Sequence, residues 1–186
     1  LAYETFSNAG VPSHFAFPVR VQQNAQFFGI SHLVEKGDDN FLGRVGLDPN
    51  GALYKVYLPL TNAYGGVAEK KTRQNEPNDD LADLGAGVNL TGAALRQYVY
   101  DNIDIPEFVN FLATIQLVQN EDCCWYKNYY LYRDTFGSGE WQILPWDLDL
   151  TFGRTFVGWG AANELIGGYF STNIFWTNRW YLQARS

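Results

Sequence analysis

Two aspartates separated by one residue, Asp147 and Asp149, have the clearest chemical potential in this sequence. They follow an apolar run and stand among large aromatic residues in the stretch 145–153, PWDLDLTFG. In an extended segment, side chains two residues apart point to the same side, so the two carboxylates would converge. Two neighbouring anions favour a bound cation or a shared proton, and carboxylate oxygens suit Mg²⁺ and similar ions. The alternative is that Asp147 caps a turn and Asp149 is solvated, because Asp is frequent in turns.

The residues before this pair predict a β-hairpin. Residues 128–133 (NYYLYR) and 141–146 (WQILPW) are aromatic and apolar runs, separated by the polar, glycine-containing residues 134–140. Two such runs around a turn are typical of a hairpin. Asp122 and Asn128 come just before it, so the order along the chain is Asp122, Asn128, hairpin, Asp147. Protein kinases order their catalytic Asp, metal-binding Asn and metal-binding Asp in the same way, although this chain has no Asp-Phe-Gly motif.

These residues resemble the CotH kinase family, which is related to spore coat protein H. The resemblance is carried by Asp122, Asn128 with the following Tyr-Tyr-Leu-Tyr, Trp141 and the stretch 145–153. A second block resembles the family's hairpin of two strands that ends in a glutamate, with further matches after it, at residues 18–22, 24–30, 33–36, 38–42 and 53–55. Together the matches cover residues 1–155. The resemblance implies an α+β, atypical protein-kinase-like fold with a β-hairpin between the catalytic loop and the metal-binding aspartate.

The resemblance also implies an activity, an ATP- and divalent-metal-dependent protein serine/threonine kinase. Its cofactor would be Mg²⁺ or Mn²⁺, its co-substrate ATP, and its acceptor a hydroxyl group of a protein substrate. Asp122 is then the candidate that positions or deprotonates the acceptor hydroxyl. Asp147 is the first candidate metal ligand, Asn128 offers an amide oxygen to the same metal, and Asp149 is a further ligand.

Three residues are candidates for nucleotide binding in the same scheme. Trp141 would stack on the adenine, Lys55 would reach a nucleotide phosphate from a strand, and Glu35 would hold a lysine or a backbone group. Trp141 has a structural alternative as a core or surface residue of the hairpin, since aromatic residues favour strands. Lys55 has one as a solvated strand residue, because lysine is usually exposed.

Composition excludes several classes of protein. The chain has 186 residues, of which 46% are hydrophobic and 18% charged, so it is neither long enough for several domains nor polar enough for disorder. Thirteen basic residues against 20 acidic ones give a net charge of −7, which argues against nucleic-acid binding. No apolar run approaches the ~20 residues that span a membrane. No secretory signal is visible, and an extracellular or spore-surface location is an expectation from the family alone.

We expect one truncated CotH-like kinase domain over residues 1–186. Residues 1–58 would be the remainder of the small lobe, 59–90 a loop-rich connection, and 91–186 the helical lobe with the catalytic loop and metal site. The expected truncation is the amino-terminal part of the small lobe, because the chain contains no Met and the family's upstream strands are not seen in it. Periodicity and capping residues predict helices at 2–9, 38–44, 79–84, 91–102 and 106–119, and strands at 15–22, 27–35 and 52–58.

Cys123 and Cys124 directly follow Asp122. Neighbouring cysteines rarely bridge each other without strain, so we expect two small, half-buried thiols rather than a disulfide.

Two other functions stay open at this point. One is a non-catalytic extracellular or coat-associated module that binds carbohydrate or protein through its aromatic residues. The other is a glycoside hydrolase with paired carboxylates such as Glu140 and Asp147. Asp147 beside Asp149, with an Asp and an Asn upstream, fits metal–phosphate chemistry better.

Overall fold

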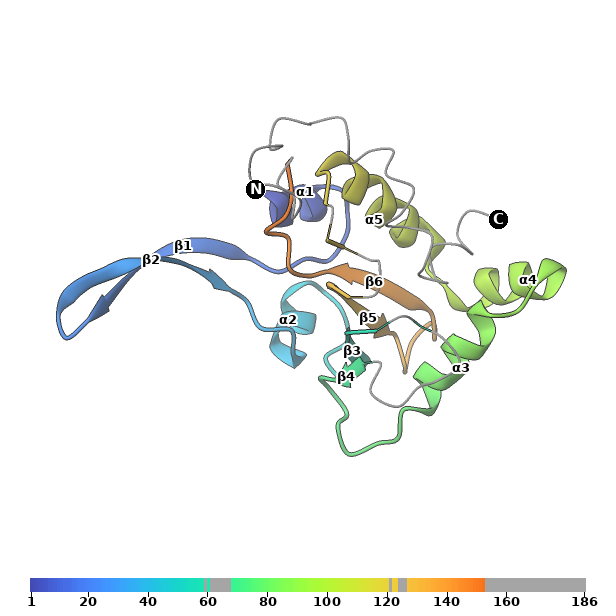
Figure 1. Ribbon diagram of the computed structural model, residues 1–186. Helices are drawn as coiled ribbons and strands as arrows, with labels where there is room; N and C mark the ends of the chain where they lie inside the picture. Colours follow the sequence, from blue (N-terminus) through green and yellow to red (C-terminus); the bar gives the residue numbers. More distant parts are fainter. Residues whose placement is uncertain (59, 61–67, 121, 124–126, 153–186) are drawn as a thin grey trace.

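A four-stranded antiparallel sheet in the order β4-β3-β5-β6 organises the chain. The computed structural model describes residues 1–58, 60, 68–120, 122–123 and 127–152, and Figure 1 shows their arrangement. The elements in chain order are α1 (Ala2–Asn8), β1 (Ala16–Gln23), β2 (Gln26–Val34), α2 (Asp39–Arg44), β3 (Ala52–Val56), β4 (Ala68–Lys70), α3 (Asp79–Val88), α4 (Gly92–Asn102), α5 (Ile105–Leu117), β5 (Tyr129–Arg133) and β6 (Trp141–Pro145). This mixture of helices and small antiparallel sheets confirms the α+β class.

The sheet is covered on both faces, which explains why β3, β5 and β6 carry apolar residues on both sides. Because side chains alternate along a strand, Tyr54 and Leu131 point to one face, and Leu53 and Tyr130 to the other. The first face packs in the larger core with residues from α1, α3 and α5. The second packs against Phe41 and other residues in and after α2. The predicted hairpin is formed by β5 and β6, with Tyr129 opposite Pro145 and Arg133 opposite Trp141.

Helix α5 lies against the hairpin and leads toward the predicted catalytic loop. Its N-cap is Asp104, whose carboxylate accepts a hydrogen bond from the backbone N–H of Glu107 at 3.1 Å. Its buried stripe includes Phe108, Phe111 and Ile115, as the 3–4 spacing predicts. The helix ends near Val118, and Gln119 then adopts a left-handed conformation with φ 52°.

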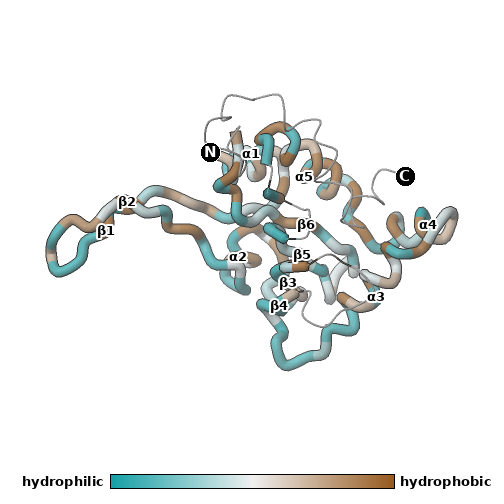
Figure 2. Tube along the Cα trace, in the orientation of Figure 1, coloured by the Kyte–Doolittle hydropathy of each residue, from teal (hydrophilic) through white to brown (hydrophobic). Residues whose placement is uncertain are grey.

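The β1–β2 hairpin extends away from the rest of the chain (Figure 1). Its turn places Asn24 and Ala25 in the left-handed region, with φ values of 52° and 62°. Apolar segments run along it (Figure 2), and Phe28 and Ile30 are 71% and 74% exposed. Isolated two-stranded hairpins are marginally stable in water, so this arm depends on the contacts at its base.

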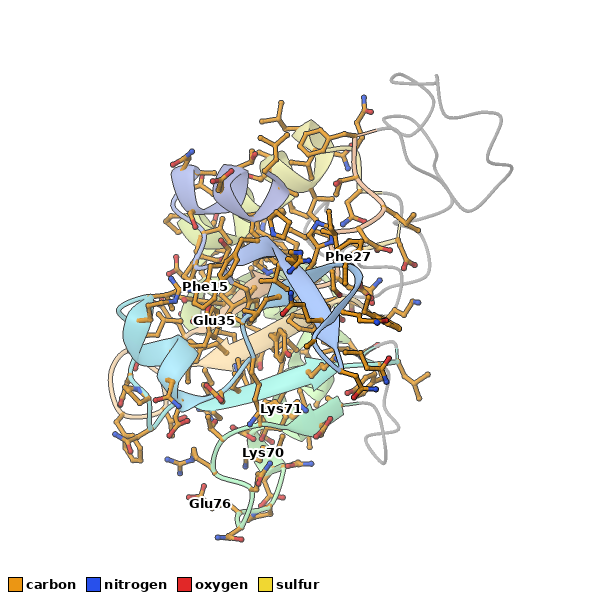
Figure 3. The ribbon with its side chains drawn as sticks, turned by 90° about the vertical axis from the view of Figure 1, so that its left-hand side faces the viewer. Phe15, Phe27, Glu35, Lys70, Lys71 and Glu76 are labelled. Carbon is orange, nitrogen blue, oxygen red and sulfur yellow. The ribbon has the colours of Figure 1, made fainter. Side chains whose placement is uncertain are left out.

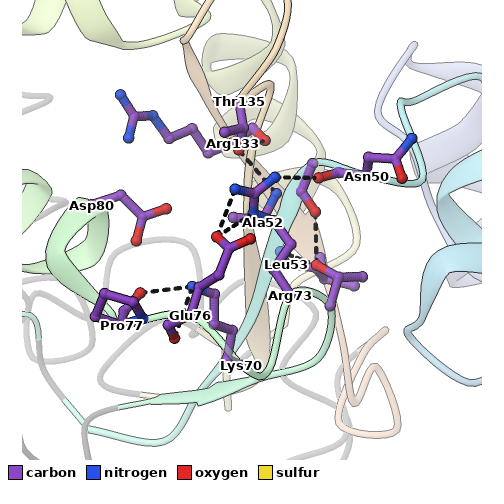
Figure 4. Close-up of polar contacts among 12 residues, drawn as sticks. Asn50, Ala52, Leu53, Lys70, Arg73, Glu76, Pro77, Asp80, Arg133 and Thr135 are labelled. Atoms are coloured by element: carbon purple, nitrogen blue, oxygen red, sulfur yellow. Dashed lines mark hydrogen bonds and ion pairs between the residues drawn. The ribbon is translucent and has the colours of Figure 1, made fainter.

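Part of the segment that the sequence predicted as a loop-rich connection is tied to the edge of the sheet (Figure 4). Arg73 bonds Glu76 through Nε at 2.8 Å and donates from Nη1 to the carbonyl of Asn50 at 3.1 Å. Lys70 Nζ donates to the carbonyl of Pro77 at 2.8 Å. These contacts lie beside strand β4, which the sequence did not predict. Helix α3 continues beyond the predicted end at residue 84 and ends at Val88.

Within the part of the chain that the structure describes, no helix combines the length and the apolar character needed to cross a membrane.

Candidate active site

The loop after α5 presents Asp122, the predicted catalytic residue. Asn120 directs this loop, because its Oδ1 accepts the backbone N–H groups of Asp122 at 2.9 Å and Cys123 at 2.8 Å. The Asp122 carboxylate is mostly buried, with 14% of its side chain exposed, and Lys127 Nζ lies 3.5 Å from its Oδ2. A carboxylate held in this way has a fixed direction, as a group that orients a hydroxyl requires.

Asn128 connects Asp122 to the strand end that carries Asp147. Its Nδ2 donates to Asp122 Oδ2 at 2.7 Å and to the Asp122 carbonyl at 3.0 Å. Its own carbonyl accepts the backbone N–H of Trp146 at 3.3 Å. The left-handed φ of 67° at Asn128 turns the chain into β5. Because Nδ2 is used on Asp122, Oδ1 is the atom of Asn128 that is left to face a cation.

The sequence predicted that Asp147 lies in an extended segment, and the structure shows that it does not. Strand β6 ends at Pro145, and Asp147 has a left-handed φ of 56°. Leu148 is buried at 7% exposure, whereas Asp147 and Asp149 are both exposed. The two exposed aspartates therefore flank a buried leucine. The backbone that carries them is a turn and not the extended strand that was predicted.

The charges around Asp147 favour a bound cation. Loss of hydration raises the pKa of the Asp147 carboxyl, and the negative charges of Asp149 and then Asp122 raise it further, while Lys127 and Lys55 oppose this. Mutual repulsion of this kind is relieved when a positive ion lies between the carboxylates. The electrostatic coupling of Asp147 to Asp122 also indicates that these two carboxylates lie near each other.

A tyrosine from the first helix lies beside the backbone at Asp147. The backbone N–H groups of Asp147 and Leu148 act to lower the pKa of the Tyr3 hydroxyl, but burial outweighs them and raises this pKa above the usual range. Tyr3 therefore lies next to the left-handed turn that carries the Asp147 carboxylate.

Lys55 reaches the same region from β3. Its Nζ lies 4.8 Å from the ring centroid of Trp146 and 5.3 Å from that of Tyr57. Burial lowers the pKa of Lys55, with a smaller lowering effect of Lys71, whereas Asp147 and Glu69 act to raise it. Lys55 is therefore a partly desolvated ammonium group within the electrostatic field of Asp147, and it is not the fully solvated lysine of the alternative interpretation.

Glu35 lies at the base of the β1–β2 hairpin, beside Phe15 (Figure 3). Its Oε1 accepts a hydrogen bond from Arg44 Nε at 2.6 Å, and its Oε2 pairs with Arg44 Nη2. The same carboxylate accepts the backbone N–H of Phe15 at 3.3 Å. Glu35 thus holds a backbone group and an arginine, and it fixes the hairpin to α2.

Trp141 is not brought to this site. It is 2% exposed and packs in the larger core, with its ring centroid 6.0 Å from that of Tyr54. Lys55 and Trp146 lie toward the opposite face of the sheet. The four-residue step from Trp141 to Pro145 adds a separation of about 13 Å along the strand. Its burial matches the core alternative stated for this residue.

The expectation for the cysteines is corrected in part. Cys123 is fully buried and disulfide-bonded, whereas we expected a half-buried free thiol. Cys124 lies outside the described residues.

The residues present fit a cation that is shared with a ligand, and they do not form a closed cage. Among the described residues, no group of three or more His, Cys, Asp or Glu side chains could hold a metal ion. Mg²⁺ commonly takes one or two carboxylates and completes its shell with water and substrate phosphates. Asp147, Asn128 Oδ1 and Asp149 are suited to that kind of partial site.

Sequence reasoning missed several residues that shape the site. Lys127 and Trp146 each directly precede a predicted ligand, so their positions were a usable signal. Tyr3 gave no such signal, because it is far from Asp147 in sequence and meets it only in the folded chain. Asn120 stood in the motif before Asp122, but only the geometry reveals that its side chain binds the loop backbone.

Comparison with known proteins places these features in a family. The sequence model of the family described as "CotH kinase protein" matches residues 1–184. A similar curated protein is "Inner spore coat protein H" of Bacillus subtilis (strain 168), which is 33% identical over 180 residues. The match covers 89% of this chain and 49% of the relative, so the chain spans about half the length of that protein.

Proposed function

Because the chain belongs to the CotH kinase protein family, we propose that it is an atypical protein kinase that transfers the γ-phosphoryl group of ATP to a serine or threonine hydroxyl. We further propose that it has the kinase-like fold that this activity requires. The observation that carries the proposal has two parts. Asn128 binds the Asp122 carboxylate and accepts the backbone N–H of Trp146, next to Asp147, and the carboxylates of Asp147 and Asp122 are electrostatically coupled. Their order along the chain is that of the catalytic Asp, metal-binding Asn and metal-binding Asp of protein kinases.

In the proposed reaction, the hydroxyl oxygen of the acceptor attacks the γ-phosphorus. The bond between that phosphorus and the oxygen bridging to the β-phosphate breaks, and ADP leaves. Asp122 accepts a hydrogen bond from the hydroxyl and takes its proton as the new bond forms. Asn128 and Lys127 hold the Asp122 carboxylate in place, so the acceptor is oriented before it reacts.

Charge neutralisation is the second requirement of phosphoryl transfer. Asp147, Asn128 and Asp149 would hold Mg²⁺ or Mn²⁺, which when bound neutralises the phosphate oxygens. Lys55 would add a positive charge from β3, where its partial burial strengthens its interaction with a phosphate. Trp141 is outside this scheme because its ring is buried.

A phosphate-transfer assay tests the proposal. The chain, γ-labelled ATP, Mn²⁺ or Mg²⁺ and a serine-rich acceptor protein should give labelled acceptor. Asp122→Asn should reduce the rate by about 10²- to 10⁴-fold, because the group that orients and deprotonates the hydroxyl is lost. Asp101→Asn, on the exposed surface of α4, should leave the rate unchanged. Equal transfer by the wild type and Asp122→Asn would refute the assigned role.

A non-catalytic, coat-associated binding module is the second candidate. The exposed apolar side chains of the β1–β2 hairpin favour it, together with the coat protein name of the relative. A glycoside hydrolase is disfavoured, since Glu140 and Asp147 flank the five residues of β6. The five-residue step from Glu140 to Pro145 alone spans about 16 Å, beyond the ~9.5 Å upper limit for paired carboxylates.

A further inference from the structure

The chain between α5 and Asp122 is anchored at one end by the helix itself. The backbone N–H of Asn120 donates to the carbonyl of Ile115 at 3.2 Å, across the left-handed turn at Gln119. Asn120 is 5% exposed, so this anchor lies inside the protein. The position of Asn120 is therefore set by α5 and not by the loop that follows.

The side chain of Asn120 transfers that position to the loop. Its Oδ1 accepts two backbone N–H groups, those of Asp122 and Cys123. Because both partners are donors, the oxygen of the amide must face them, which fixes the orientation of the group. Asn128 then binds the carboxylate of Asp122 from the other direction, at 2.7 Å.

We infer that Asn120 is a positioning residue for phosphoryl transfer: it fixes the backbone from which Asp122 reaches the acceptor hydroxyl. The inference rests on the proposed function. It adds to that function a residue that acts through Asp122 and touches neither ATP nor the acceptor. Two asparagines orient Asp122. Asn120 binds the backbone of Asp122, and Asn128 binds the Asp122 carboxylate. Loss of either contact leaves the carboxylate free to rotate away from the acceptor.

Substitutions at Asn120 separate positioning from packing. Asn120→Ala removes the acceptor of both hydrogen bonds. Asn120→Asp keeps an acceptor oxygen in the same place and adds a negative charge near Asp122. Asn120→Asp also removes the Nδ2 group of Asn120. This group is buried without a hydrogen-bond partner among the described residues, so its loss removes no hydrogen bond there. Asn102→Ala is the matched control, because the side chain of Asn102 also binds the backbone at the end of a helix, where its Nδ2 donates to the carbonyl of Tyr98 at 2.9 Å.

Steady-state kinetics with Mg·ATP and a protein acceptor give the first readout. Asn120→Ala should lower kcat about ten- to 100-fold with KM for ATP within about threefold of the wild type, since a small misplacement of an aligned group has effects of this size. Asn120→Asp should keep kcat within about threefold at its optimum.

Amide hydrogen exchange gives a readout that does not depend on activity. The N–H groups of Asp122 and Cys123 should exchange faster in Asn120→Ala and at the wild-type rate in Asn120→Asp, while Asn102→Ala changes neither. A wild type that transfers no phosphate would overturn the proposed function, and exchange alone would then decide whether Asn120 holds the loop. Unchanged exchange in Asn120→Ala would overturn the inference, as would an Asn120→Asp variant whose kcat is as low as that of Asn120→Ala.

Discussion

Asp122 and Asp147 differ in how their carboxylates are held, and this difference supports the roles that we propose for them. Asp122 is hydrogen-bonded to Asn128 and lies 3.5 Å from Lys127, which gives it a fixed direction. Asp147 is exposed, and the pKa of its carboxyl is raised by desolvation and by neighbouring negative charges. A directed carboxylate suits an acceptor hydroxyl, and a carboxylate crowded by other anions suits a cation.

Two buried titratable side chains, Glu107 and His14, give the protein opposite responses to pH. Burial raises the pKa of Glu107 from 4.5 to about 8 and lowers that of His14 from 6.5 to about 3. The contribution of Glu107 to stability is therefore complete below pH 4.5 and is lost as pH rises toward 8. That of His14 is complete above pH 6.5 and is lost as pH falls toward 3.

Glu107→Gln should remove the first response. Gln keeps an acceptor for the backbone N–H of Ile143, which Glu107 Oε2 accepts at 3.1 Å. Relative to the wild type, the variant should gain about 3–4 kcal/mol in free energy of unfolding between pH 5 and pH 8, at ~1.4 kcal/mol per pH unit. Urea denaturation at both pH values measures this. His14→Phe is the opposite control, with a changed pH dependence only below pH 6.5, and parallel pH profiles for Glu107→Gln and the wild type would contradict the account.

At the scale of elements, the sequence predicted those whose signals are local. The β5–β6 hairpin follows from two apolar runs around a glycine-containing turn, and α2 from Asp38, which caps Asn40 and Phe41 as expected. Strand β4 has three residues, two of them charged, and gives no periodic signal. Helix α3 passes through Gly85 and Gly87, which lower helix propensity but are buried in packing that overrides it.

The site was predictable in its order and not in its geometry. Asp122, Asn128 and Asp147 could be found by type and spacing, because their sequence neighbours predicted a hairpin between them. The left-handed turn at Asp147 could not be predicted, because Asp147 lies beside Tyr3, which is far from it in sequence, only in the folded chain. Trp141 was predicted to stack on the adenine of the nucleotide, because sequence alone does not show on which face of a strand an aromatic ring lies.

The β1–β2 hairpin provides a prediction at this scale. Ala25 occupies a left-handed position at φ 62° in the turn, next to Asn24 at 52°. Asn-Gly is the preferred sequence for such a turn, so Ala25→Gly should stabilise the hairpin by about 0.5–1 kcal/mol. Slower amide exchange along β1 and β2 would show this. Ala16→Gly, within β1, should have the opposite effect, and equal effects of the two substitutions would contradict the turn assignment.

At the scale of the whole molecule, the charge distribution limits what the chain can bind unaided. A net charge of −7 opposes the approach of ATP, which is itself strongly negative. Positive groups at the site must therefore offset the negative charge of the chain. Lys55 and Lys127 do so only in part, since three carboxylates lie beside them. In the proposed reaction a divalent cation would supply the missing charge, so nucleotide binding should depend strictly on the metal.

Calorimetric titration of ATP with and without Mg²⁺ or Mn²⁺ tests this claim most directly. The wild type should bind ATP with the metal and at least about 100-fold more weakly without it, a difference of ~2.7 kcal/mol. Asp147→Asn should lose most of the metal-dependent affinity, and Asp122→Asn should retain it, because Asp122 contacts the acceptor and not the nucleotide. ATP affinity that is the same with and without metal, or unchanged in Asp147→Asn, would contradict the account.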